Sequence, residues 1–324
     1  MIASRLETEL AAALTIAGDA SVPPAERAEM LMEIAIGLQR RPKTPDHLTG
    51  AVALYERGLA VCPEDEPLLR ARLVARRGTA LQAVPDDGTD TLEAARLAYE
   101  EAIPVFKALG SREEVAETEM NLGLVIQYLA GAGRARIVDA IDAYQRALRT
   151  FDRQAWPAEF AILQNNLATA FLSMPLVDER SKMREALAVQ AFEEGLKVVT
   201  LIDHPQEYAM LQNNLGNALQ YVSSGHAIEN NLRAVEAYDE ALRVRTRETA
   251  PLEYANTIAN KANCLMNLPD HPEDPASGNS ANLARARLWL EEAQAIFADH
   301  GELAKARIVG EPLAGLRDMM SLAN

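Results

Sequence analysis

Residues 234–242 read Ala-Val-Glu-Ala-Tyr-Asp-Glu-Ala-Leu, and this nine-residue stretch recurs along the chain. Its members Ala234, Ala237, Tyr238 and Ala241 fall at i, i+3, i+4 and i+7, which is one face of an α-helix. A stretch that returns at a nearly constant interval predicts an array of similar helical units. Close copies begin at Ala51, Ala95, Ala140 and Ala188, and an altered copy with Leu290 at the aromatic place begins at Ala286.

A second pattern lies between these copies. The interval from the aromatic residue of one copy to the small residue that follows is 23 residues once and 24 residues four times. Such constancy predicts that each repeat is one helix pair, and Pro157, Pro205 and Pro251 are expected in the first turn of their helices. The pattern reads Met-Asn-Leu-Gly at 120–123, Asn-Asn-Leu-Ala at 165–168, Asn-Asn-Leu-Gly at 213–216 and Ala-Asn-Lys-Ala at 259–262, with Arg76-Arg77-Gly78 in an earlier copy.

The small residues of the second pattern indicate close helix packing. Gly123, Ala168, Gly216 and Ala262 carry little or no side chain, so the partner helix can approach. We expect the aromatic residue of each repeat to fill the space between neighbouring pairs. Pro104 is expected to kink its helix.

The two patterns together resemble the tetratricopeptide repeat (TPR). The matching residues are Leu122-Gly123 and Leu215-Gly216, followed by Ala140, Ala188 and Ala234, each with an aromatic residue four positions later and a small residue three further on. The units are longer than ordinary TPR units of about 34 residues. They are similar to those of kinesin light chain and of bacterial arrays rich in Asn-Asn-Leu-Gly. The resemblance implies an all-α, right-handed TPR-type superhelical solenoid of about six helix pairs.

We expect one domain over residues 1–324. An N-terminal capping helix falls in 1–20, the repeats in 25–300 and a C-terminal capping helix in 301–324. The last helix is richer in apolar residues than a solvent-facing cap requires, which leaves open a homo-oligomer formed through it. These residues are Leu303, Ile308, Val309, Leu313, Leu316, Met319 and Met320.

Composition excludes several classes of function. With 32 Lys and Arg against 47 Asp and Glu, the net charge is −15, which argues against a nucleic-acid or anionic-membrane partner. No apolar stretch is long enough to span a membrane. Cys62 and Cys264 cannot form a Cys-x-x-Cys site and are expected to be buried in a reducing compartment. We expect a cytoplasmic protein whose partner carries a basic region.

Asparagine recurs on the helices of the second pattern, at Asn121, Asn166, Asn214 and Asn260. We call these four residues the asparagine row. Asparagine is about 0.6 kcal/mol less favourable than alanine in a helix, so its repetition suggests a use. By resemblance to TPR proteins, the row and the adjacent Asn217 and Asn263 would hold the backbone of a peptide in a groove. This groove would be lined by the first helix of each pair, which is the helix that carries the second pattern. The alternative is that each amide bonds to the next repeat and only fixes the stacking.

Arg72 and Arg76 stand one turn apart on a first helix and are expected to face the same groove. Two guanidinium groups on one face suit a carboxylate or phosphate. TPR proteins that bind the C-terminal carboxylates of heat-shock chaperones carry basic residues at these places, which makes the pair a candidate anion anchor. The alternative is that both arginines pair with acidic neighbours.

No catalytic pattern is present in the sequence. We found no nucleophile with a base, no phosphate-binding loop and no metal-ligand spacing, so we expect neither an enzyme nor a cofactor or metal site. The acidic loop 269–275 is interpreted as a solvated excursion. The predicted function is a protein–protein interaction scaffold, adaptor or assembly factor that binds a protein or peptide segment. A peptide or small-molecule sensor and a self-assembling structural protein are the alternatives.

Overall fold

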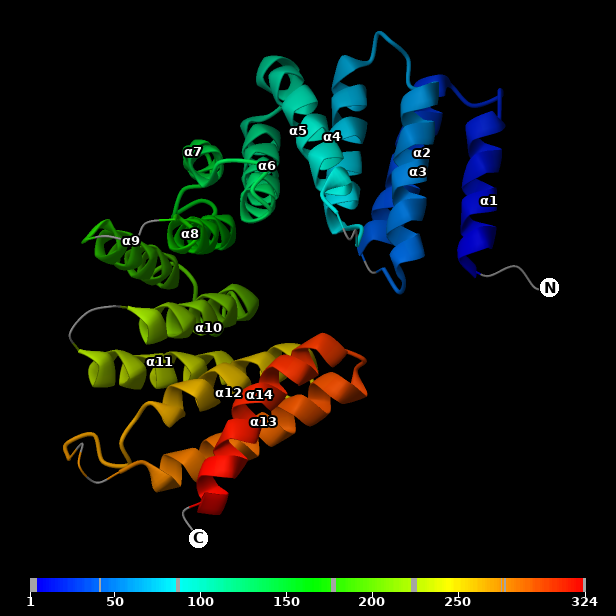
Figure 1. Cartoon of the computed structure of the whole chain (residues 1–324). Helices are drawn as coiled ribbons and strands as arrows, with labels where there is room; N and C mark the ends of the chain where they lie inside the picture. The colour runs from blue at the N-terminus through cyan, green and yellow to red at the C-terminus, as the bar shows by residue number, and fades with distance from the viewer. Residues whose placement is uncertain are drawn as a thin grey trace. The chain divides into compact units, whose positions relative to one another are not determined.

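The computed structural model (Figure 1) describes residues 5–40, 42–85, 88–175, 179–222, 226–274, 276 and 278–322. Within these ranges it contains fourteen α-helices and no strand, which confirms the all-α prediction. The helices are α1 (Arg5–Gly18), α2 (Pro24–Arg40), α3 (Pro45–Val61), α4 (Pro67–Ala83), α5 (Asp90–Leu109), α6 (Arg112–Gly131), α7 (Ile137–Ala147), α8 (Pro157–Leu172), α9 (Glu179–Leu196), α10 (Pro205–Tyr221), α11 (Ala227–Leu242), α12 (Pro251–Met266), α13 (Ser280–Asp299) and α14 (Leu303–Leu322).

The helices pack as consecutive pairs, as predicted. The pairs are α2 with α3, α4 with α5, α6 with α7, α8 with α9, α10 with α11 and α12 with α13, and α1 and α14 flank them. The chain separates into two compact units, Met1–Asp152 (unit 1) and Arg153–Asn324 (unit 2). In unit 1 the helices α1 to α5 lie side by side in chain order (Figure 1). The assignment of all 324 residues to a single domain stays a prediction.

Three first helices begin with a proline, as the sequence predicted. Pro157, Pro205 and Pro251 occupy the first turn of α8, α10 and α12. A proline in that turn loses no intrahelical hydrogen bond, because the N–H groups there have no partner within the helix. Helix α5 continues through Pro104 to Leu109.

Tyr99, Tyr144 and Tyr238 lie against the small residue of their own pair, a contact that the sequence did not predict, and Tyr238 also shares an apolar cluster with Cys264 of the next pair. A Cβ atom on Gly123 would lie 2.5 Å from Cε1 of Tyr144, and one on Gly216 would lie 2.7 Å from Cε1 of Tyr238. The small residue that stands three positions after the aromatic residue contacts a leucine of the next pair instead. A Cβ on Gly58 would come within 2.9 Å of Leu73 Cδ2. Small residues therefore set the packing distance both within and between pairs.

Each buried tyrosine hydroxyl is held by a glutamine of the first helix of its pair. Tyr144 donates a hydrogen bond of 2.9 Å to Gln127 Oε1, and Gln127 lies one turn after Gly123. The same arrangement joins Tyr55 to Gln39 and Tyr99 to Gln82. In the fourth case the direction is reversed, because Gln220 Nε2 donates to the Tyr238 hydroxyl, which itself donates to Asn217 Oδ1. Where the aromatic is Phe192, the glutamine position holds Leu172, and where it is Leu290 the position holds Met266. The polar partner thus appears only where a buried hydroxyl requires one.

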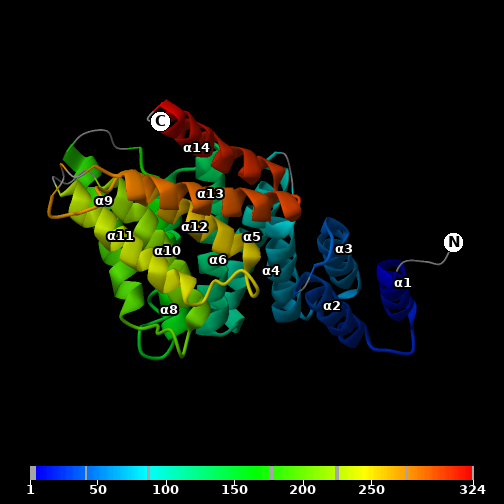
Figure 2. The same ribbon diagram turned by 90° about the horizontal axis from the view of Figure 1, so that it is seen from below.

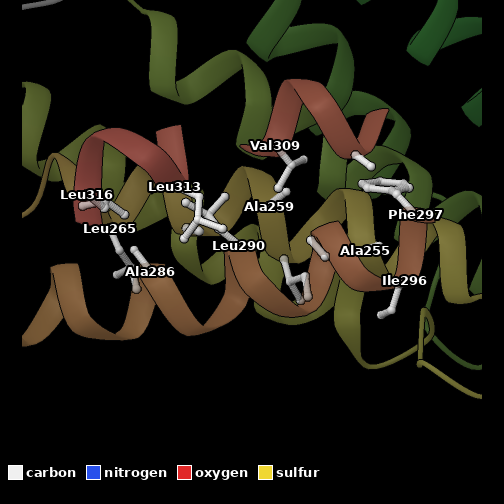
Figure 3. Packing of buried hydrophobic residues seen from close by; sticks show 14 of the residues in the cluster. Ala255, Ala259, Leu265, Ala286, Leu290, Ile296, Phe297, Val309, Leu313 and Leu316 are labelled. Atoms are coloured by element: carbon white, nitrogen blue, oxygen red, sulfur yellow. The ribbon is translucent and has the colours of Figure 1, made fainter. Parts of the chain in front are cut away.

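Helix α14 covers the last pair of unit 2. It lies along α13 in Figure 2, and its residues Val309, Leu313 and Leu316 join the apolar cluster of α12 and α13. Figure 3 shows Leu313 pointing toward Leu290 of α13. Of the apolar residues noted in the sequence, Leu303 and Ile308 are exposed, and the side chains of Met319 and Met320 lie outside the described part. Helix α14 therefore packs an apolar face on the last pair, and its role as a terminal cap and assembly through it stay predictions.

Candidate functional site

A pocket in unit 1 is formed mainly by three successive first helices. Its cavity volume is about 200 Å³. It brings together three of the residues predicted from the sequence, namely Arg72 and Arg76 on α4 and Asn121 on α6. The other lining residues are Met32, Glu33 and Ile36 of α2, Ala75 and Thr79 of α4, Tyr99 and Phe106 of α5, and Glu114, Glu117 and Thr118 of α6. We call this the unit 1 pocket.

Arg72 is held by the residue that caps helix α6. Its Nε donates a hydrogen bond of 2.7 Å to Oε1 of Glu114. The other oxygen of Glu114 accepts a hydrogen bond of 2.9 Å from the backbone N–H of Ser111, and the Ser111 hydroxyl accepts from the Glu114 backbone N–H, so the two form a capping box. Burial would raise the pKa of Glu114, but the hydrogen bonds from Arg72 and Ser111 outweigh it and hold this pKa below its ordinary value. The carboxylate is therefore engaged at both oxygens.

Arg76 is paired in the same way with the next turn of α6. Its Nη1 lies 3.2 Å from Oε1 of Glu117. Both members of this pair are more than two-fifths exposed, so the pair contributes little to stability. The predicted anion anchor therefore consists of two arginines that already contact acidic neighbours.

The capping box makes unit 1 sensitive to acid. We expect Glu114→Gln to lower the free energy of unfolding by about 0.2–1 kcal/mol at neutral pH, because it removes the negative charge that pairs with Arg72, while the amide oxygen can still accept from the Ser111 N–H. Since folding lowers the pKa of Glu114, this contribution is present above the ordinary value of 4.5 and is lost as the pH falls through the folded-state pKa. Urea unfolding of wild type and variant over a pH series should show the difference shrinking toward zero in acid.

Glu113→Gln is the matched control for this prediction, because Glu113 is an exposed neighbour on the same turn. A stability difference between wild type and Glu114→Gln that persists unchanged at low pH would contradict the role assigned to the carboxylate.

In unit 2 the asparagines form a continuous chain of hydrogen bonds across three first helices. Asn214 Nδ2 donates to Asn165 Oδ1 over 2.7 Å, which links α10 to α8. Asn213 Nδ2 donates to Asn214 Oδ1 over 3.0 Å, and the Thr257 hydroxyl of α12 lies 3.0 Å from Asn213 Oδ1. The chain ends at Arg245, which donates to Thr257 Oγ1, and at Asn166, which accepts from Asn165. These amides bind one another and join the repeats.

The predicted residues divide into two groups by their contacts. Both ends of the Asn214 amide are used, and Asn217 Oδ1 accepts a hydrogen bond of 2.7 Å from the Tyr238 hydroxyl. In contrast, the described residues provide no hydrogen bond to the side-chain amides of Asn121, Asn260 and Asn263. Of these three residues, Asn121 lines the unit 1 pocket. Both interpretations of the asparagines therefore have members that fit them.

Sequence reasoning missed the residues that complete these arrangements. Asn213 is 3% exposed and Thr257 is fully buried, and the sequence marked neither of them as a site residue. Glu114 and Glu117 were not recognised as partners of the arginines. A signal was available for Glu114, because Ser111-x-x-Glu114 before an apolar stretch is the sequence pattern of a capping box.

The other features noted in the sequence have structural explanations. Asp270, in the loop 269–275, accepts hydrogen bonds from the backbone N–H groups of Ala281 and Asn282, so this part of the loop is fixed to the start of α13; Pro275 lies outside the described residues. No group of three or more His, Cys, Asp or Glu able to hold a metal ion occurs in the described part. Cys62 and Cys264 are free and buried, and burial raises the pKa of Cys264 to about 12.

The helix-pair array is TPR-like. No family model matches the chain, and no curated protein does. Among solved structures, BtubC (BKLC) from P. vanneervenii is similar at 18% identity over 98% of this chain and 93% of that chain, with a TM-score of 0.39. A Rap protein complexed with competence and sporulation factor is similar at 12% identity over 100% and 90%, with a TM-score of 0.48. Aspartyl phosphate phosphatase F from Bacillus subtilis is similar at 13% identity over 98% and 95%, with a TM-score of 0.46.

At such identities and TM-scores these likenesses carry no argument about a ligand or an activity. The TPR-like description rests on the consecutive helix pairs and on the tyrosine–glycine contacts within them. None of the described helices is both long and apolar enough to cross a membrane.

Proposed function

We propose that this chain is a non-catalytic scaffold or adaptor that holds a segment of a partner protein in the unit 1 pocket. The observation that supports this function is the pocket itself, in which three first helices gather Arg72, Arg76 and Asn121 around apolar side chains. Pockets that bind drug-sized molecules usually measure about 300–1,000 Å³. A cavity of about 200 Å³ suits one side chain of a longer segment better than a cofactor.

The contacts of the asparagines favour unit 1 over unit 2 as the binding site. In unit 2, Asn214 and Asn217 are already hydrogen-bonded within the fold. A ligand there would have to break those bonds, and a buried polar group left unpaired costs about 1–3 kcal/mol. In unit 1, the amide of Asn121 lacks such a bond within the described residues. It offers a donor and an acceptor to the backbone of a peptide.

The proposed mode of binding needs no chemical step. The partner segment would place an apolar side chain against Met32, Ile36 and Phe106, and its backbone would pair with Asn121. Affinity then comes from apolar burial and from preformed polar groups on helices that do not need to reorganise. The charged residues at the rim set which segments are accepted.

The proposal is tested by affinity capture from the native lysate with four proteins. They are the wild type, Ala75→Gln, Asn121→Ala and Asn260→Ala. Ala75→Gln adds a long side chain to the pocket lining. Asn260 is the matched control, because it holds the same repeat position in unit 2 and its amide is also unbonded within the described residues. All four should have equal helicity and melting temperature.

We expect a partner that wild type and Asn260→Ala retain, that Asn121→Ala retains less, and that Ala75→Gln loses. A partner that all four proteins retain equally would show that the unit 1 pocket is not the binding site. Loss with Asn260→Ala as well would show that Asn260 of unit 2 also takes part in binding.

A further inference from the structure

The charges around the unit 1 pocket do not suit an anionic ligand. The lining holds two guanidinium groups, Arg72 and Arg76, and three carboxylates, Glu33, Glu114 and Glu117. Each arginine is paired with a carboxylate. Glu33 is exposed and has no cationic partner within the described residues. The net charge of the lining is therefore negative, in a chain whose net charge is −15.

We propose that the unit 1 pocket selects a partner segment in which an apolar side chain stands beside a lysine or arginine, and that it discriminates against acidic segments. This inference rests on the proposed function, whose ligand class it specifies. It departs from the expectation that Arg72 and Arg76 anchor an anion.

Glu114 occupies the Nε donor of Arg72, so a ligand carboxylate is left only the other N–H groups of this guanidinium. A ligand that bound its Nε would have to displace Glu114, which also accepts from the Ser111 backbone N–H at the start of α6. Displacement would break the capping box and leave a carboxylate that is only one-quarter exposed without its cation. An acidic ligand would add a further negative charge beside it.

A cationic ligand group meets no such obstacle. Glu33 lines the pocket from α2, whereas the carboxylates that pair with the arginines lie on α6. Within the described residues, no cation pairs with the Glu33 carboxylate. A lysine or arginine beside the apolar anchor can pair with Glu33 while both existing ion pairs stay intact. The apolar part of the lining, which includes Met32, Ile36 and Phe106, accepts the anchor. The occupant therefore needs both features next to each other.

The test uses a displayed library of random peptides selected on the immobilised full chain. We expect the selected peptides to share an apolar residue with Lys or Arg enriched beside it and with Asp and Glu depleted. Synthetic copies of a selected peptide should bind Glu33→Gln about two- to fivefold more weakly than wild type, as for the loss of one partly exposed ion pair. Glu29→Gln is the matched control, because Glu29 is exposed on the same helix and does not line the pocket.

The outcomes separate this inference from the proposed function. Suppose that the selected peptides are enriched in Asp or Glu and bind wild type but not Ala75→Gln. This result would overturn the inference and leave the pocket as the binding site. Basic peptides whose affinity is the same for Glu33→Gln and Glu29→Gln would also overturn it, because Glu33 would then play no part in selection. If no motif is enriched on the wild type, the proposed function loses its support together with the inference.

Discussion

Gly123→Ala is expected to lower the free energy of unfolding by about 1–3 kcal/mol. The added Cβ would lie 2.5 Å from Cε1 and 2.7 Å from Cδ1 of Tyr144, and this ring is fully buried. Turning of the ring is opposed by its complete burial and by the hydrogen bond of its hydroxyl to Gln127. The pair α6–α7 must therefore open or strain, as in other overpacked cores. Chemical denaturation of the full chain measures the loss, and hydrogen exchange should place it in α6 and α7.

Gly37→Ala is the matched control for this prediction. Gly37 also lies within a helix, but beyond its chain neighbours and the nearby backbone of its own helix no atom lies within 4 Å of the position of an added Cβ. This variant should stabilise the protein by up to about 1 kcal/mol through helix propensity alone. The double variant Gly123→Ala/Tyr144→Leu should recover part of the loss, because unit 2 combines Ala262 with Leu290 at the same two places. Equal stability of Gly123→Ala and Gly37→Ala would refute the packing explanation.

Asn213→Ala is expected to cost about 1–3 kcal/mol of unfolding free energy. Asn213 is 3% exposed and stands in the middle of the hydrogen-bond chain of unit 2. Its removal leaves Asn214 Oδ1 without the donor it has in the fold, and the Thr257 hydroxyl loses one of its partners while it keeps Arg245 and the Glu253 carbonyl. Buried polar groups without partners carry this cost. Hydrogen exchange should become faster in α10 and α12 and remain unchanged in unit 1.

Asn260→Ala provides the comparison for Asn213→Ala. The described residues provide no hydrogen bond to its side chain, and alanine is the better helix former by about 0.6 kcal/mol, so stability should be unchanged or slightly higher. If the two variants lose equal stability, the amides of unit 2 do not act as a connected chain. If neither loses stability, the asparagines are kept for another purpose, and the division between the two units would need revision.

These two comparisons also bear on function, because they separate stability from binding. The asparagine row looks uniform in the sequence, but Asn214 is bonded on both sides and Asn121 on neither within the described residues. Replacing every member of the row by alanine would therefore mix an effect on stability with an effect on binding. Asn121 and Asn260 are the members that can be changed to test binding without disturbing the fold.

The repeat spacing by itself predicted the helices and their pairing. An interval of 24 residues between an aromatic and a small residue requires a rigid unit, and helical periodicity then places both residues on facing surfaces. The same periodicity placed Arg72 and Arg76 on one face, and the structure brings them into one pocket with Asn121. The pairing of buried tyrosines with glutamines was also readable, since the glutamine disappears at Phe192 and Leu290.

Only the tertiary structure decided which polar groups are already satisfied. Asn165 and Asn214 are 49 residues apart, and Arg72 and Glu114 are 42 apart, yet each pair is joined over 2.7 Å. Periodicity fixes the face on which a side chain lies, to within about one turn of helix. A hydrogen bond needs atoms placed within about 3 Å, which depends on the offset between neighbouring helices and on rotamers. The sequence could therefore predict a polar face, whereas its division into bonded and unbonded amides required the packed array.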